Sequence, residues 1–111
     1  MILTDAVEIL SLNHDGTSSK TCERILMRGP RLEVIADIHK VVQFSIGSFS
    51  IVQISEQVPE HDLTYAMCGH VYHVSDTSLY ISCGGLLVKV NVLLTEPVKL
   101  HTKLYVTFAA P

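Results

Sequence analysis

Apolar and polar side chains alternate with a period of two along most of this chain. Three segments show the alternation most clearly. Their apolar faces are Leu32, Val34, Ala36 and Ile38; Leu86, Val88, Val90 and Val92; and Leu104, Val106 and Phe108. Because successive side chains of a strand point to opposite faces, the pattern predicts strands with one buried face. No window has the apolar spacing of a helix, so we expect an all-β fold.

Turn-forming residues separate the alternating segments. They are Asn13-His14-Asp15-Gly16, Gly29-Pro30, Gly47, Val58-Pro59, Ser75-Asp76-Thr77 and Glu96-Pro97. The strands predicted between them cover residues 2–12, 20–28, 31–38, 48–55, 64–74, 78–83, 85–94 and 102–109. Short strands at this spacing are typical of a barrel or a sandwich. About eight strands suffice to close a barrel and to hide its edges, so we predict one barrel domain over residues 1–111.

The chain is unusually apolar, with 48% hydrophobic residues, 17% charged residues and a mean hydropathy of +0.35. A membrane-spanning helix needs roughly 20 consecutive apolar residues. Runs such as Val92-Leu93-Leu94 are far shorter, so we expect no membrane span. The apolar excess then predicts a barrel core together with an apolar outer patch covered by another chain.

Charge and cysteine content narrow the function classes further. The chain has eight Lys and Arg residues and eleven Asp and Glu residues, so its net charge is −3. This balance excludes a general phosphate-binding surface, although a local basic patch is still possible. The three cysteines, Cys22, Cys68 and Cys83, are odd in number, and the acidic start of the sequence does not resemble a signal peptide. We therefore expect a reducing compartment and buried free thiols.

Two kinds of chemical site are weakly indicated. Cys68, His70, His73 and Cys83 are metal-ligand types, but a regular strand would point His73 away from Cys68 and His70 unless a bulge at Gly69 intervened. Their spacing matches no standard zinc pattern. No nucleophile elbow or phosphate-binding glycine loop occurs either. We expect no metal, no cofactor and no catalytic residue.

Single-stranded nucleic-acid binding is the alternative that the residues themselves favour. Small barrels bind single strands through aromatic side chains and a basic groove on one sheet face. Tyr65, Tyr72, Tyr80 and Tyr105, with scattered lysines, fit such a face. Tyrosines of barrels also pack at the core margin and hydrogen-bond through the hydroxyl, so this alternative stays open.

Two blocks of the sequence resemble a known family. Residues 65–74 read Y-A-M-C-G-H-V-Y-H-V and are similar to that family's strand Y-V-M-x-G-x-V-Y-x-I. Residues 80–90 read Y-I-S-C-G-G-L-L-V-K-V and resemble its signature Y-x-S-x-G-G-L-L-M-R-L. Weaker similarity covers residues 2–5, 13–16, 33–38 and 104–106. The family is the eighth shared subunit of the eukaryotic nuclear DNA-directed RNA polymerases I, II and III.

The resemblance implies an OB-like, eight-stranded antiparallel barrel. It also implies that the protein is located in the nucleus. It implies a non-catalytic subunit that docks on the largest polymerase subunit and its neighbours and supports transcription, with weak or no direct contact to nucleic acid. The family's attachment motif corresponds here to Gly84, Gly85, Leu86, Leu87 and Val88. Leu86 and Val88 share a face and are equally explained as core residues. Leu87 points the opposite way and is the better candidate for an outside contact.

The sequence also departs from the family. Val88 replaces the family's methionine, and only residues 56–63 stand where the family has a long acidic loop. The connection at residues 75–78 is short as well. His70 and His73 stand where the family commonly has Lys or Arg, which favours solvent-exposed polar positions over metal ligation.

Overall fold

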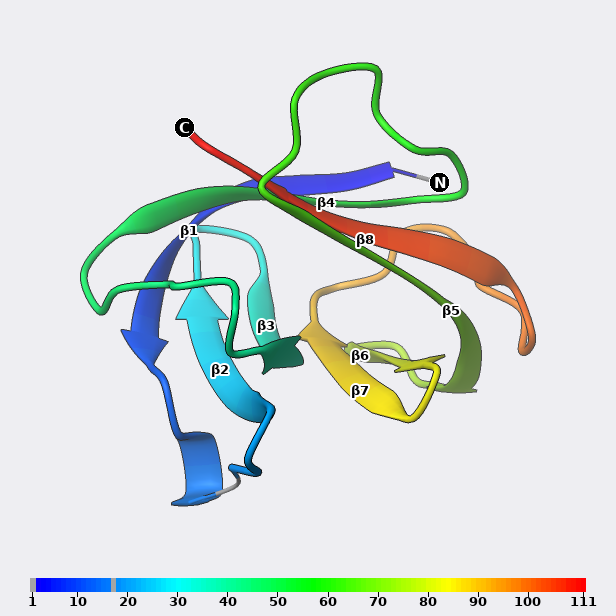
Figure 1. Cartoon of the computed structure of the whole chain (residues 1–111). Coiled ribbons are helices and arrows are strands. Elements are labelled where there is room, and N and C mark those ends of the chain that lie inside the picture. The colour runs from blue at the N-terminus through cyan, green and yellow to red at the C-terminus, as the bar shows by residue number, and fades with distance from the viewer. Residues whose placement is uncertain (1, 17) are drawn as a thin grey trace.

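The computed structural model describes residues 2–16 and 18–111 and is almost entirely β-structure (Figure 1). Its strands are β1 (Ile2–Ser11), β2 (Cys22–Arg28), β3 (Glu33–His39), β4 (Phe49–Ser55), β5 (Tyr65–Val74), β6 (Ser78–Cys83), β7 (Leu86–Asn91) and β8 (Lys103–Ala109). Among the described residues the one helical element is a short 3-10 turn, η1 (His14–Gly16). The all-β prediction is therefore confirmed. No helix in these two ranges is long and apolar enough to cross a membrane.

The eight strands form one closed antiparallel barrel in the order β1-β2-β3-β7-β6-β5-β8-β4. β1 closes it, because its first part pairs with β4 from Ile2 to Glu8 and its last part pairs with β2 from Glu8 to Ser11. Figure 1 shows β1 running beside β4 before it turns toward β2. Sequential neighbours pair in the β2–β3, β5–β6 and β6–β7 hairpins, whereas β3–β7 and β4–β8 join distant parts of the sequence.

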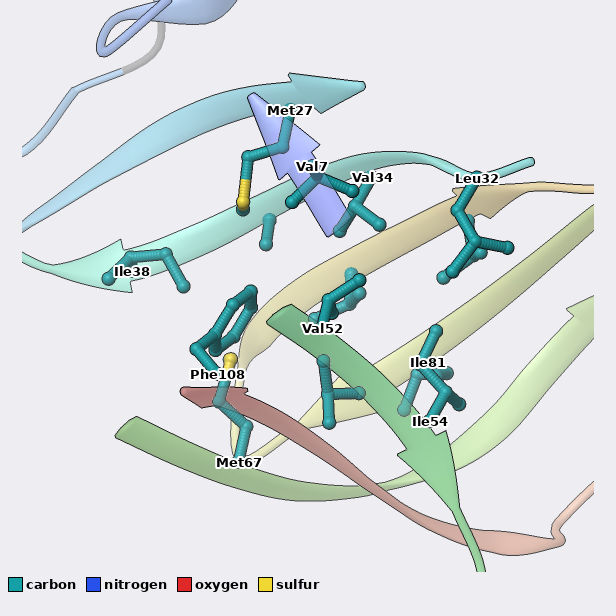
Figure 2. Packing of buried hydrophobic residues seen from close by; sticks show 14 of the residues in the cluster. Val7, Met27, Leu32, Val34, Ile38, Val52, Ile54, Met67, Ile81 and Phe108 are labelled. Atoms are coloured by element: carbon teal, nitrogen blue, oxygen red, sulfur yellow. The ribbon is translucent and has the colours of Figure 1, made fainter. Parts of the chain in front are cut away.

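Aliphatic side chains from every strand fill the barrel (Figure 2). The largest fully buried ones include Phe108, Ile9, Ile25, Met27, Ile38, Ile54, Leu79 and Ile81. Phe44, from the β3–β4 connection, packs edge-on against Phe108 with ring centroids 5.7 Å apart. The three apolar faces expected from alternation all point inward, with Leu86 and Val92 partly buried against the core and the other nine residues buried. Fully burying one such side chain contributes about 1.5–3 kcal/mol.

The largest error in the predicted strand limits lies at the end of β7. This strand ends at Asn91 and not at residue 94. The extended pairing continues past it, because the Val92 and Leu94 N–H groups donate to the carbonyls of Thr77 and Asp76 at 3.0 and 3.1 Å. β3 begins at Glu33 and not at Arg31, because residues 29–32 form the turn of the β2–β3 hairpin.

The buried carboxylate of Asp5 fastens this hairpin to β1. One of its oxygens accepts hydrogen bonds from the Arg31 and Leu32 N–H groups at 2.7 and 2.9 Å, and the other accepts from the Ala6 N–H at 3.0 Å. Asp5 is only 8% exposed. A Cβ atom at Gly29 would come closer than 3.0 Å to this carboxylate and to the Ala6 carbonyl, so glycine is needed where the hairpin meets β1.

Candidate partner-docking surface

The β6–β7 hairpin carries the five residues that the resemblance singles out. Cys83 pairs with Leu86, so Gly84 and Gly85 form a two-residue turn. Their φ angles are +59° and +93°. A two-residue hairpin turn with positive φ at both positions strongly favours glycine. A Cβ atom at either position would meet no heavy atom within 4 Å, so the turn needs glycine for its backbone conformation and not for close packing within this chain.

The three residues after the turn divide between the core and the outside. Val88 is buried in the core, and Leu86 is partly buried against it. Leu87 lies on the opposite face and is 39% exposed. The predicted orientation of Leu87 is thus confirmed, whereas its binding role stays a prediction.

The backbone at Leu87 is held by a side chain from β3. β3 pairs with β7 from Glu33 to Ala36, and beyond that point the Leu87 N–H donates to Asp37 Oδ2 at 2.9 Å. Arg24 on β2 binds the same carboxylate with Nε and Nη2, at 2.8 and 3.2 Å. This hydrogen bonding raises the pKa of Arg24. Asp37 therefore links three strands and fixes the start of β7.

A groove of about 270 Å³ lies beside Leu87 on the outer surface of the barrel. It is lined by His14, Asp15, Arg24, Ile35, Tyr72, Tyr80, Leu87, Val88 and Lys89. The rings of Tyr72 and Tyr80 meet edge-on with centroids 5.9 Å apart, and Lys89 Nζ lies 5.4 Å from the Tyr80 centroid. Aromatic and aliphatic surface thus adjoins Leu87.

The charges near the groove are mixed. Arg24 is neutralised by Asp37, and the His14 ring lies 3.4 Å from the Asp15 carboxylate. Along the same outer face, hydrogen bonds from Arg28 and then from Asn91 lower the pKa of Glu33. Phosphate binding depends on unneutralised cations, so the paired Arg24 contributes little to it, and Lys89 is the lysine in the groove that lies over an aromatic ring.

The four tyrosines do not form one platform. Tyr65 packs against Phe108 at the core margin, with centroids 6.3 Å apart. Tyr105 lies on β8 with Lys103 Nζ 5.4 Å from its ring, and hydrogen bonding to Tyr105 raises the pKa of Lys103. Only Tyr72 and Tyr80 share the groove beside Leu87. The aromatic face suggested by the sequence is therefore reduced to this pair.

The residues considered for a metal site lie on β5 and β6. Cys68 and His70 are exposed because they alternate with the buried residues of β5. His73 is exposed as well, because a shift of the β5–β6 register between Val71 and His73 brings it to the outer surface. The irregularity follows Val71 and does not lie at Gly69. The ring of His73 packs edge-on against Tyr80, with centroids 5.1 Å apart. Among residues 2–16 and 18–111, no group of three His, Cys, Asp or Glu side chains is arranged to hold a metal ion.

The cysteines are free thiols in different environments. Cys83 is buried, and burial raises its pKa to about 11, so the thiol stays protonated and unreactive near neutral pH. Cys22 is partly buried, and Cys68 is exposed. The expectation of three buried thiols is therefore wrong for Cys68. Met67 points into the core, so Cys68, the next residue of β5, points outward.

Comparison with known proteins adds no family to this description. No family model matches the chain, and no curated protein matches it either.

The sequence did not point to Asp37 or Arg24 as residues that position the hairpin, since neither belongs to a recognisable motif. They pair across β2 and β3 in the observed register, in which Arg24 lies opposite Asp37. Their opposite charges could have indicated that register, but not the bond from Leu87, which needs the distant β3–β7 pairing.

Proposed function

We propose that this barrel is a non-catalytic structural subunit shared by nuclear DNA-directed RNA polymerases, and that it docks on the largest polymerase subunit through the β6–β7 hairpin. The support from the sequence is the resemblance of residues 80–90 to the attachment motif of that family. A nuclear location follows from the proposal.

The structural observation that carries the proposal is an exposed leucine on a fixed strand. Leu87 presents apolar surface outward, while its N–H is held by Asp37 and the following Val88 is anchored in the core. A backbone held in place loses little entropy on binding, and preorganisation of this kind strengthens an interface. The neighbouring groove provides further aromatic surface for a partner.

Co-purification with the polymerase tests this function directly. Tagged Leu87→Asp should fold normally but should recover at least about tenfold less of the largest polymerase subunit than the wild-type chain, because a carboxylate would be desolvated in the interface. Leu100→Asp is the matched control, since Leu100 is 52% exposed and lies outside the hairpin. A wild-type chain that recovers no polymerase subunits contradicts the function. Equal recovery by Leu87→Asp contradicts the docking site.

The Tyr72–Tyr80 pair beside Lys89 favours a second candidate function, single-stranded nucleic-acid binding. Stacking of a base on an aromatic ring contributes about 1–3 kcal/mol, and a neighbouring lysine adds attraction to phosphate. Only one such aromatic pair is present in the groove, so this candidate is the weaker one.

A salt titration with labelled oligothymidylate separates the two functions. Real phosphate contacts would make the logarithm of affinity fall linearly with the logarithm of salt concentration. Tyr80→Ala would weaken that binding, whereas Tyr105→Ala, outside the groove, would not. An absence of binding at low salt removes this second candidate.

A further inference from the structure

The first residues of β1 form an open strand edge. β1 pairs with β4 from Ile2 onward, but its pairing with β2 begins only at Glu8. The β2–β3 hairpin turns back at residues 29–32 and does not reach the start of β1. In the part of the chain that the structure describes, no strand pairs with Ile2–Thr4 on this side. The barrel is closed further along β1, but here it has a gap.

The main-chain groups of Ile2 and Thr4 face this gap. The Ile9 N–H donates to the Ser48 carbonyl and the Ile9 carbonyl accepts from Gly47, both at 2.9 Å, so the odd-numbered residues of β1 turn their main-chain groups toward β4. The even-numbered residues turn theirs the other way, as the Thr4 carbonyl shows by accepting a hydrogen bond from the Arg31 guanidinium. An extended peptide laid along Ile2–Thr4 would meet donors and acceptors in strand register.

An apolar groove of about 470 Å³ lies along the same edge. It is lined by Ile2, Leu3, Thr4, Arg31, Leu32, Val92, Leu93 and Thr95. Ile2 is 67% exposed and Leu93 is 74% exposed. The Val92 N–H, at the wall opposite β1, donates to the Thr77 carbonyl on the side of β6. The groove can therefore hold the side chains of a strand paired with β1.

We propose that this gap is a strand-addition site for an extended, apolar peptide segment of a partner protein that carries a carboxylate beside its apolar residues. The main-chain groups of Ile2 and Thr4, which no strand of the described residues pairs with on this side, fit an extended peptide, since β-augmentation draws its affinity from such edges and its specificity from adjacent pockets. Arg31 supplies the charge complementarity. Its guanidinium covers the Thr4 carbonyl in the free protein, and a peptide carboxylate offers it a stronger, ionic hydrogen bond that uncovers the edge.

This site does not depend on the proposed polymerase function. Leu87 lies near the start of β7, and Leu93 lies two residues past its end. Six residues of extended chain at about 3.3 Å each separate the two side chains by roughly 20 Å. A variant at Leu87 should therefore leave strand addition unchanged, and a variant at Leu93 should leave the hairpin surface unchanged. The two proposals can fail separately.

The test uses two fluorescein-labelled peptides of about eight residues, a common strand length, in which Val and Ser alternate and one position is either Glu or Lys. The fluorescence anisotropy of the Glu peptide should rise as the whole chain is added, with the Lys peptide bound at least about fivefold more weakly. Leu93→Asp should weaken the Glu peptide by at least about tenfold, whereas Leu87→Asp and Leu100→Asp should bind it like the wild type. Arg31→Gln should bind the two peptides equally.

Thr4→Pro tests the backbone pairing itself. Proline removes the N–H that faces the gap and leaves Leu3 and Asp5 free to keep their pairing with Ile54 and Val52 of β4, and an edge position tolerates it. Binding should fall by at least about tenfold while far-UV circular dichroism stays unchanged. In the wild-type complex, hydrogen exchange measured by NMR should slow at the Thr4 amide.

Three results would overturn the proposal. The first is no binding of the Glu peptide at about 1 mM. The second is a Thr4 amide that exchanges equally fast with and without the bound peptide. The third is a chain that dimerises in solution and becomes monomeric in Leu93→Asp, because the occupant of the groove would then be a second copy of the chain.

Discussion

Replacing Asp5 by alanine removes the link between β1 and the β2–β3 hairpin. Three N–H groups lose their acceptor. The bond from the Leu32 N–H is buried, whereas the bonds from the Arg31 and Ala6 N–H groups are only partly buried. An unsatisfied buried donor costs about 1–3 kcal/mol, and the loss of a partly buried hydrogen bond costs about 0.5–1.5 kcal/mol. The expected loss in free energy of unfolding is therefore about 3 kcal/mol for Asp5→Ala.

Asparagine at the same position gives a graded result. Its amide oxygen can keep the bonds from Arg31 and Leu32, but its NH₂ group would face the Ala6 N–H, so only one of the three bonds is lost. The expected loss is about 1 kcal/mol. Guanidinium denaturation followed by circular dichroism measures both variants, and Asp62→Ala, an exposed aspartate, is the control. If Asn costs as much as Ala, or if Ala costs less than about 1 kcal/mol, the carboxylate does not fasten the hairpin as described.

Three further predictions concern β5, the thiols and acid stability. Gly69→Ala should destabilise the barrel by about 1–3 kcal/mol in the same denaturation assay, because the new Cβ would lie within 3.0 Å of a main-chain oxygen of β6; a neutral effect would contradict this close approach. In the folded protein, iodoacetamide should label Cys68 much faster than Cys83, whose pKa is about 11; mass spectrometry of digested peptides checks this, and equal rates would contradict the burial of Cys83. Because hydrogen bonding from Arg28 lowers the folded-state pKa of Glu33, its contribution to stability is present above the unfolded-state pKa and is lost as pH falls through the folded value. Glu33→Gln should therefore lose less stability than the wild type between about pH 5 and pH 3 in acid titrations of unfolding, and equal losses would refute this role.

Side-chain alternation was enough to predict the strands and the inward faces. Val34, Val88 and Val106 are buried because every second residue of a strand returns to the same face, a relation that holds whatever the strand pairs with. The same relation placed Leu87 outside. It failed at His73, because the irregularity after Val71 changes the phase of β5, and nothing in the local sequence requires that shift.

The sequence by itself determined an all-β chain with eight strands and the inward faces of three of them, which include Val34, Val88 and Val106. These features depend on local backbone preference and on a period of two, which neighbouring residues fix. Only the tertiary structure decided that β3 pairs with β7, that Asp37 holds the Leu87 backbone, and that Ile2–Thr4 faces an open gap beside Leu93. The physical reason is that pairing between distant strands is chosen by the closure of the whole barrel, where many weak contacts act together and no single segment specifies its partner.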